Sequence, residues 1–127
     1  MDKKISPELP VTLVVGASEN TARYSNIAVN KLVQFGHPVI ALGHRAGKIG
    51  TIPIVTEVAP ETEIDTITLY VGPPGQSELM DTLLRLHPKR IIFNPGTENP
   101  EFISKAHQQG IETEIACTLV MLSLGTY

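Results

Sequence analysis

Phosphate binding is the chemistry that the best-defined stretch of this sequence favours. Five residues with branched or apolar side chains, Val11 to Val15, lead directly into Gly16 and then into a short polar loop. A buried strand, a glycine turn and the beginning of a helix together form an anion site, because free backbone N–H groups and the helix dipole point to the same place. Gly16 permits the tight turn, while Ala17 and Ser18 are small enough to leave the turn open to a ligand. Ser25 or Asn26 is expected to cap the helix that follows.

A second group of candidate residues carries positive charge. His44, Arg45 and Lys48 follow the apolar run Val39–Leu42, in a loop (GHRAGKIG) that also contains three glycines. A NAD site needs a carboxylate near this point to bind the ribose hydroxyls, whereas the next carboxylate here is Glu57. Positive charge instead suits a ligand with an additional phosphate, either the 2′-phosphate of NADP or the 3′-phosphate of coenzyme A.

Two common nucleotide-binding motifs are not met. The GxGxxG pattern starting at Gly16 has Ser18 and Thr21 at its other two glycine positions, and GxxxxGK[ST] is absent. The residues therefore indicate a phosphate-bearing ligand without specifying a dinucleotide or a nucleoside triphosphate.

Apolar segments alternate with helical patterns, which is typical of a parallel sheet covered on both faces. Strands are expected at 11–15, 39–42, 51–55, 66–71 and 90–93, with one more short strand at 112–116. Helices are expected at about 25–35, 76–87 and 100–109, with helical turns at 56–61 and a helix or turn at 119–124. We predict an α/β fold: a Rossmann-like three-layer sandwich with a five-stranded parallel sheet in the order 3-2-1-4-5, forming a single domain over residues 1–127.

Such sheets bind their ligands at the carboxyl ends of the strands. Four loops are expected at that edge: Gly16–Ser25, Gly43–Lys48, Gly72–Gly75 and Asn94–Asn99. All four are rich in glycine, proline or small polar residues, so the pattern predicts a binding crevice there.

Composition narrows the choice of partners. A net charge of −3 argues against general nucleic-acid binding. No apolar stretch approaches the roughly 20 residues of a membrane span, and the first residues lack the pattern of a signal peptide. The single cysteine, Cys117, excludes an internal disulfide. We therefore expect a cytoplasmic protein with no membrane partner, and no metal site because CxxC, HExxH and clustered His/Cys spacings are absent.

Four segments together resemble the CoA-binding domain family, small stand-alone proteins similar in fold to the amino-terminal domain of the succinyl-CoA synthetase α subunit. The segments are Val14–Ser18, Gly47–Pro53, Tyr70–Pro73 and Ile91–Gly96, and the resemblance spans about residues 10 to 120. It implies a CoA or acyl-CoA ligand. The phosphates of that ligand would be contacted by Gly16, Ala17, Ser18 and Asn20, and Lys48 would contact either the phosphates or the pantetheine.

The resemblance also assigns the rest of the ligand. The adenine would lie against Tyr70, Val71, Gly72 and Pro73, and the pantetheine arm would pass Asn94, Pro95 and Gly96. Cys117 matches a cysteine that recurs near the last helix of such proteins and could form a mixed disulfide with CoA, although a lone cysteine is usually inert packing. The synthetases use a phosphorylated histidine in a further domain that residues 1–127 do not include, so the resemblance does not lead us to expect the ligase reaction.

Three functional interpretations remain open. The first is a CoA- or acyl-CoA-binding protein with a non-catalytic or regulatory role, because no nucleophile–base pair for acyl transfer is identifiable. The second is an NADP-dependent oxidoreductase-like or redox-sensing nucleotide-binding protein. The third is an interaction module in which the apolar tail Leu119–Leu122 forms a homodimer surface.

Overall fold

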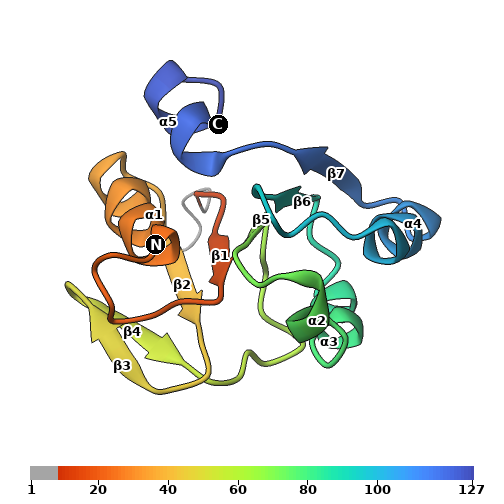
Figure 1. Cartoon of the computed structure of the whole chain (residues 1–127), viewed down its shortest axis with the longest axis horizontal. Helices are drawn as coiled ribbons and strands as arrows, with labels where there is room; N and C mark the ends of the chain where they lie inside the picture. The colour runs from red at the N-terminus through yellow and green to blue at the C-terminus, as the bar shows by residue number, and fades with distance from the viewer. Residues whose placement is uncertain (1–8) are drawn as a thin grey trace, which may run out of the picture.

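The computed structural model describes residues 9–127 as one mixed β-sheet with helices on both faces (Figure 1). The strands in this part of the chain are β1 (Thr12–Val15), β2 (Val39–Leu42), β3 (Gly47–Ile49), β4 (Ile52–Val55), β5 (Thr66–Leu69), β6 (Arg90–Phe93) and β7 (Glu112–Ile115). The helices are α1 (Tyr24–Gln34), α2 (Pro73–Gln76), α3 (Met80–Arg85), α4 (Pro100–Gln108) and α5 (Thr118–Leu124). The strands lie in the order β3-β4-β2-β1-β5-β6-β7.

The prediction of a five-stranded, fully parallel sheet is wrong: within residues 9–127 the sheet has seven strands, and β3 pairs antiparallel with β4. The five expected strands are β4, β2, β1, β5 and β6, which are consecutive neighbours and parallel. The extra strand β3 comes from the glycine-rich segment that the sequence suggested was a loop. Gly50, at φ +60°, turns the chain back from β3 into β4. At the other edge β7, expected as a strand but not as part of the sheet, pairs parallel with β6.

Two apolar layers on opposite faces of the sheet confirm the three-layer arrangement. Side chains alternate along β1, so that Leu13 packs in the layer that includes α3 and α4 residues, and Val14 packs in the layer that includes α1 and α5 residues. In the first layer the rings of Phe93 and Phe102 meet edge to face, with 5.4 Å between their centroids, and join β6 to α4. Figure 1 shows α1 and α5 on one side of the sheet and α2, α3 and α4 on the other.

Helix boundaries differ from the expectation in three places. α1 begins at Tyr24 with Arg23 as its N-cap residue, so neither Ser25 nor Asn26 caps it, and both are buried. The helix expected at 76–87 is shorter, since α3 covers only Met80–Arg85, and a separate short helix, α2, precedes it across a turn. The segment 56–61 is not helical. The α1 helix does end as expected, with Gly36 in the left-handed region at φ +86°.

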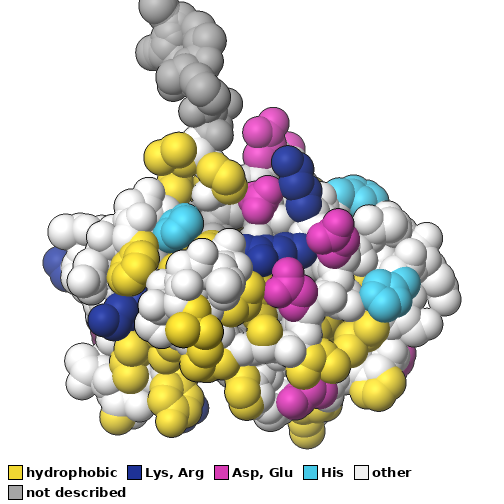
Figure 2. Space-filling model, turned by 90° about the horizontal axis from the view of Figure 1, so that it is seen from above, with side chains coloured by type: hydrophobic (Ala, Val, Ile, Leu, Met, Phe, Trp, Pro, Cys, Tyr) yellow, Lys and Arg dark blue, Asp and Glu magenta, His cyan; other side chains and the backbone are white. Residues whose placement is uncertain are grey.

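Charges of both signs are interspersed on the surface seen in Figure 2 rather than gathered into one basic area. Two ion pairs tie neighbouring strands and loops together: Arg90 with Glu114 at 3.2 Å and Lys89 with Asp65 at 3.8 Å.

Among residues 9–127, no helix is long and apolar enough to span a membrane, and no group of His, Cys, Asp and Glu side chains could hold a metal ion.

Candidate functional site

The backbone at Gly16 leaves no room for a side chain. Its φ of +96° lies in the left-handed region, and a Cβ there would be 2.9 Å from Cγ2 of Val71 and 3.2 Å from the carbonyl carbon of Tyr70. The N–H groups of Gly16 and Ala17 both donate to the carbonyl of Leu42 at 2.9 Å. Glycine is therefore needed where β1 ends between β2 and β5, and these two N–H groups are already used within the protein.

Among the described residues, backbone N–H groups without a protein partner occur just after the turn and in the first turn of α1. In the part of the chain that the structure describes, the backbone N–H groups of Ser18, Glu19, Tyr24 and Ser25 donate to no other protein group. The side-chain amide of Asn26 donates to the Ser18 carbonyl at 2.9 Å and keeps the turn against α1. Free N–H groups next to a helix N-terminus are the arrangement that favours a bound phosphate.

A cleft of about 460 Å³ lies between this turn and the loop that follows β2. The structure brings together six of the predicted site residues along it: Gly16, Ala17, Ser18, Asn20, His44 and Arg45. Four residues that were not predicted also line it: Glu19, Arg23, Ala46 and Ile54. The cleft lies at the carboxyl ends of β1 and β2, as the sheet topology required.

Three cationic or potentially cationic side chains line the cleft. Arg23 comes from the residue that precedes α1, whereas His44 and Arg45 come from the loop after β2. One carboxylate lies with them: Oε2 of Glu19 accepts a hydrogen bond from the backbone N–H of Lys48 at 2.9 Å. Two arginines together with unused N–H donors fit a ligand that carries several phosphate charges.

A smaller apolar pocket of about 160 Å³ adjoins the cleft and shares Gly16 and His44 with it. Its other lining residues are Val15, Leu42, Gly43, Thr56, Val71 and Leu79. Gly43 is in close contact here, since a Cβ on it would lie 2.4 Å from the carbonyl oxygen of Ala17. The combined site therefore offers a cationic part and an apolar part side by side.

Tyr70 lies apart from both hollows. Its side chain packs against the apolar layer that includes α1 and α5 residues, while the neighbouring Val71 packs on the opposite side and lines the apolar pocket. The Tyr70 hydroxyl is buried and has no hydrogen-bond partner among the described residues. Burial raises the pKa of this hydroxyl to about 12.

Asn94 ties β5, β6 and α5 together from inside the protein. Its side-chain amide donates to Oγ1 of Thr68 at 2.7 Å and to the carbonyl of Leu69 at 2.9 Å, and its oxygen accepts from the N–H of Thr118 at 2.8 Å. Buried Gln76 has a similar role between two loops, donating to the carbonyls of Val71 and Thr97 at 2.7 Å. The hydrogen bonds of these two side-chain amides connect the loops at the carboxyl ends of the strands.

The remaining predicted residues do not line the cleft. Lys48 is exposed on β3, and Ser25 is buried in the first turn of α1. Gly72 precedes α2 and Pro73 begins it, on the loop that Gln76 fastens. Pro95 and Gly96 are exposed in the loop after β6, where Gly96 N–H donates to Glu98 at 2.8 Å.

Sequence reasoning missed Glu19 and Arg23. A signal was available for Arg23, because it lies within the loop Gly16–Ser25 and carries the charge that a phosphate site requires. Glu19 gave no such signal, because its negative charge does not suit an anion site. Its place in the cleft is explained by the hydrogen bond that it accepts from the Lys48 N–H.

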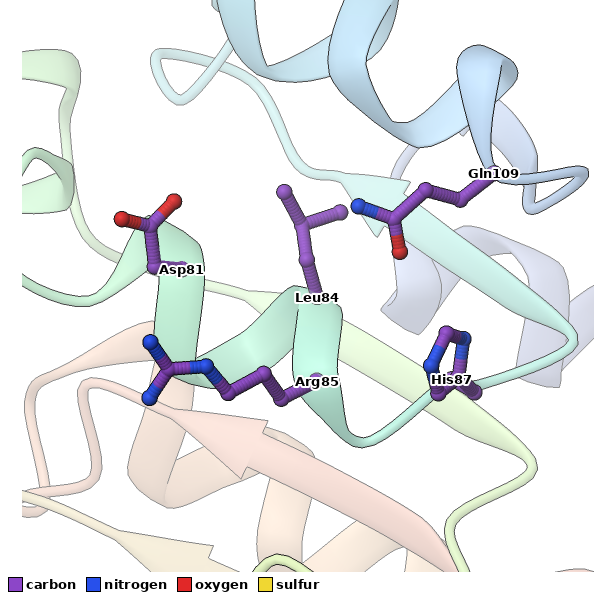
Figure 3. A pocket seen from close by; sticks show the side chains of 5 residues that line it. All are labelled: Asp81, Leu84, Arg85, His87 and Gln109. Atoms are coloured by element: carbon purple, nitrogen blue, oxygen red, sulfur yellow. The ribbon is translucent and has the colours of Figure 1, made fainter.

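A second hollow of similar volume, about 450 Å³, lies near the amino ends of β6 and β7, opposite the carboxyl ends where the cleft is found (Figure 3). It is lined by Asp81, Leu84, Arg85, His87 and Gln109, from the ends of α3 and α4 and the turns after them. Its polar side chains are exposed and its charges are of both signs. None of the predicted site residues reaches it, so the cleft beside Gly16 is the better candidate for a ligand site.

Comparison with known protein families identifies the class of protein to which this fold and cleft correspond. The model of the family described as "CoA binding domain" matches residues 11–123. The chain therefore belongs to the CoA binding domain family. A comparison with curated proteins found no match.

Solved structures show the same fold. A crystal structure of a protein described as uncharacterized is 42% identical, with a TM-score of 0.89, and the match covers 94% of this chain and 99% of that one. The structure of cell-free ID.343 from Thermus thermophilus is 17% identical, with a TM-score of 0.81 and coverage of 94% and 91%. A dinucleotide-forming acetyl-coenzyme A synthetase 1 from Ca. Korarchaeum cryptofilum, in complex with phosphate and ADP, is 18% identical, with a TM-score of 0.67 and coverage of 81% and 25%. The last two show likeness of fold alone.

Proposed function

We propose that this protein binds coenzyme A or an acyl-CoA in the cleft beside Gly16, in a non-catalytic or regulatory role. The observation that carries the proposal is the cleft itself: unused N–H donors after Gly16, with Arg23 and Arg45 on two different loops, at the carboxyl edge of the sheet. Membership of the CoA binding domain family supports CoA over other polyanions.

The two parts of the site suit the two kinds of group in CoA. The diphosphate would be bound by the N–H groups of Ser18 and Glu19 and by the N-terminus of α1, and the 3′-phosphate by the arginines and His44. The adenine would lie in the apolar pocket against Val71, which belongs to the segment Tyr70–Pro73. The pantetheine arm would leave past Asn94–Gly96. Bound CoA would supply a thiol that carries acyl groups as thioesters.

The environment of the Ser18 hydroxyl group, which lies in the cleft, favours binding without catalysis. Oγ of Ser18 accepts a hydrogen bond from the Asn20 N–H at 3.1 Å, and no basic side chain of the described residues is hydrogen-bonded to it. Acyl transfer through a serine needs a base within hydrogen-bond reach to activate the hydroxyl. We therefore assign no reaction to the site.

Calorimetric titration with CoA, dephospho-CoA and NADP tests the proposal. We expect CoA to bind more tightly than dephospho-CoA, because the 3′-phosphate meets the arginines. Absent binding of CoA would refute the proposal, and equal binding of CoA and dephospho-CoA would remove the assignment of the 3′-phosphate. Tighter binding of NADP, with a change in nicotinamide fluorescence on titration with NADPH, would instead support the oxidoreductase-like alternative.

A further inference from the structure

Glu19 connects two segments that form opposite walls of the cleft. Its carboxylate accepts a hydrogen bond from the Lys48 N–H at 2.9 Å, across 29 positions of sequence. The same carboxylate packs directly on Gly47, where an added Cβ would lie 2.6 Å from both Cδ and Oε2 of Glu19. We call this contact the hairpin clip: the Glu19 carboxylate, the Gly47 backbone and the Lys48 N–H.

The hairpin clip fixes the loop that carries the cations. His44 and Arg45 lie a few residues before β3, and β3 is a three-residue strand at the edge of the sheet, paired only with β4 among the described strands. Ile49, at the end of β3, is buried against the α1 layer, but Gly47 at its beginning is joined to the β1–α1 turn through Glu19. Without the clip, β3 would lose its hydrogen bond to the β1–α1 turn, and the loop from His44 to Ala46, which leads into β3, would lose that support.

We propose that Glu19 is a positioning residue for the ligand: its carboxylate holds the cationic loop at the spacing at which His44 and Arg45 reach phosphates bound at the Gly16 turn. This inference rests on the proposed binding of CoA in the cleft. It assigns an acidic side chain a favourable part in binding a polyanion, which is the reverse of what its charge alone predicts.

Charge and positioning make opposite predictions, and the chain offers variants that separate them. Glu19→Gln removes the negative charge but keeps an oxygen that accepts from Lys48 N–H. Gly47→Ala keeps the charge but displaces the carboxylate, and it does so at low cost, because the colliding atoms are the far end of a flexible side chain. Glu19→Ala removes both, and Glu63→Ala, at an exposed residue outside the cleft, controls for net charge.

The affinity for CoA is measured by calorimetry for the wild type and the four variants. We expect Glu19→Ala and Gly47→Ala to bind CoA about tenfold more weakly, the size of one lost hydrogen bond to a charged group. Glu19→Gln should bind as the wild type does or more tightly, and Glu63→Ala should be unchanged. Tighter binding by Glu19→Ala, or unchanged binding by Gly47→Ala, would overturn the positioning role.

Hydrogen exchange of the Lys48 amide without ligand provides an independent measurement. Protection should be present in the wild type and in Glu19→Gln, and about tenfold lower in Glu19→Ala and Gly47→Ala. Equal exchange in all five proteins would show that no clip forms, which overturns the inference even where CoA binds. If the variants show this pattern of protection but the wild type binds no CoA, the proposed function is refuted, and the positioning role with it.

Discussion

At the level of single residues, the cleft depends on arginine side chains that reach it from two different loops. Arg23 and Arg45 line it, whereas the side chain of Lys48, the cation that the family resemblance singled out, is exposed on β3 outside the lining. We expect Arg23→Ala and Arg45→Ala each to weaken CoA binding by about 1–2 kcal/mol, since a hydrogen bond between charged groups is lost at an exposed site. Lys48→Ala should have a smaller effect.

The measurement is calorimetry with CoA and dephospho-CoA for each variant. An arginine that contacts the 3′-phosphate should lose affinity for CoA but little for dephospho-CoA, whereas an arginine on the diphosphate should lose affinity for both. A larger loss in Lys48→Ala than in either arginine variant would contradict the assignment of the cleft.

Tyr70 predicts a pH dependence of stability. Burial raises the pKa of its hydroxyl from 10.0 to about 12, so the unfolded chain releases this proton at lower pH than the folded protein does. The contribution of Tyr70 to stability is therefore complete below about pH 10 and is lost as pH rises towards 12, at up to about 1.4 kcal/mol per pH unit. Tyr127, whose pKa is also raised by burial, adds to the same loss.

Urea unfolding between pH 8 and 11.5 measures this dependence. Tyr70→Phe should reduce the slope above pH 10 without abolishing it, because Tyr127 remains. At pH 8 the variant should be at least as stable as the wild type, since the deleted hydroxyl is buried without a hydrogen-bond partner. An unaltered slope in Tyr70→Phe would mean that its hydroxyl is solvated in solution.

At the level of the elements, the turn between β1 and α1 requires glycine for two separable reasons. Gly16 and Gly36 both lie in the left-handed region, at φ +96° and +86°, but only at Gly16 would a Cβ meet neighbouring atoms. Gly36→Ala should therefore cost only the backbone strain, about 1 kcal/mol, whereas Gly16→Ala should cost about 2–4 kcal/mol. Chemical denaturation of the two variants measures the difference, and equal losses would indicate that Val71 moves away freely.

The elements also show which parts of the fold and site the sequence could predict. The alternation of apolar strands and helices placed β1, β2, β4, β5 and β6 correctly and predicted the edge at which the cleft lies. It missed β3, because a three-residue strand made of a glycine, a lysine and an isoleucine is too short to show strand periodicity, and β3 forms only by pairing with β4.

Long-range contacts explain the residues whose place was not predictable. Asn94 looked like a loop residue open to ligand, yet its amide is used by Thr68, Leu69 and Thr118, which are 24 or more positions away in the sequence. Glu19 was not predicted to belong to the site, and its hydrogen bond with the Lys48 N–H joins residues 29 positions apart. A pattern of residue types cannot contain such pairings, because they depend on which loops the completed sheet brings together.

At the level of the whole molecule, the apolar tail that suggested a homodimer serves mainly the protein's own core. Met121 and Leu122 are buried, whereas Val120 and Leu124 on the outer side of α5 are 51% and 70% exposed. Figure 1 shows α5 at the outside of the sheet next to α1. A pair of side chains on a seven-residue helix is a small apolar surface compared with the roughly 1,200–2,000 Å² that stable interfaces bury.

We therefore expect any pairing of two copies through α5 to be weak and dependent on concentration. In a two-fold interface the same residue occurs on both sides, so Leu124→Lys would place two positive charges close together and oppose association. Light scattering should give a mass that rises with concentration for the wild type and stays at that of one chain for Leu124→Lys. Ser104→Lys adds the same charge on α4, across the sheet, and should behave as the wild type. A mass that stays at one chain for the wild type at every concentration, with or without CoA, would exclude the homodimer.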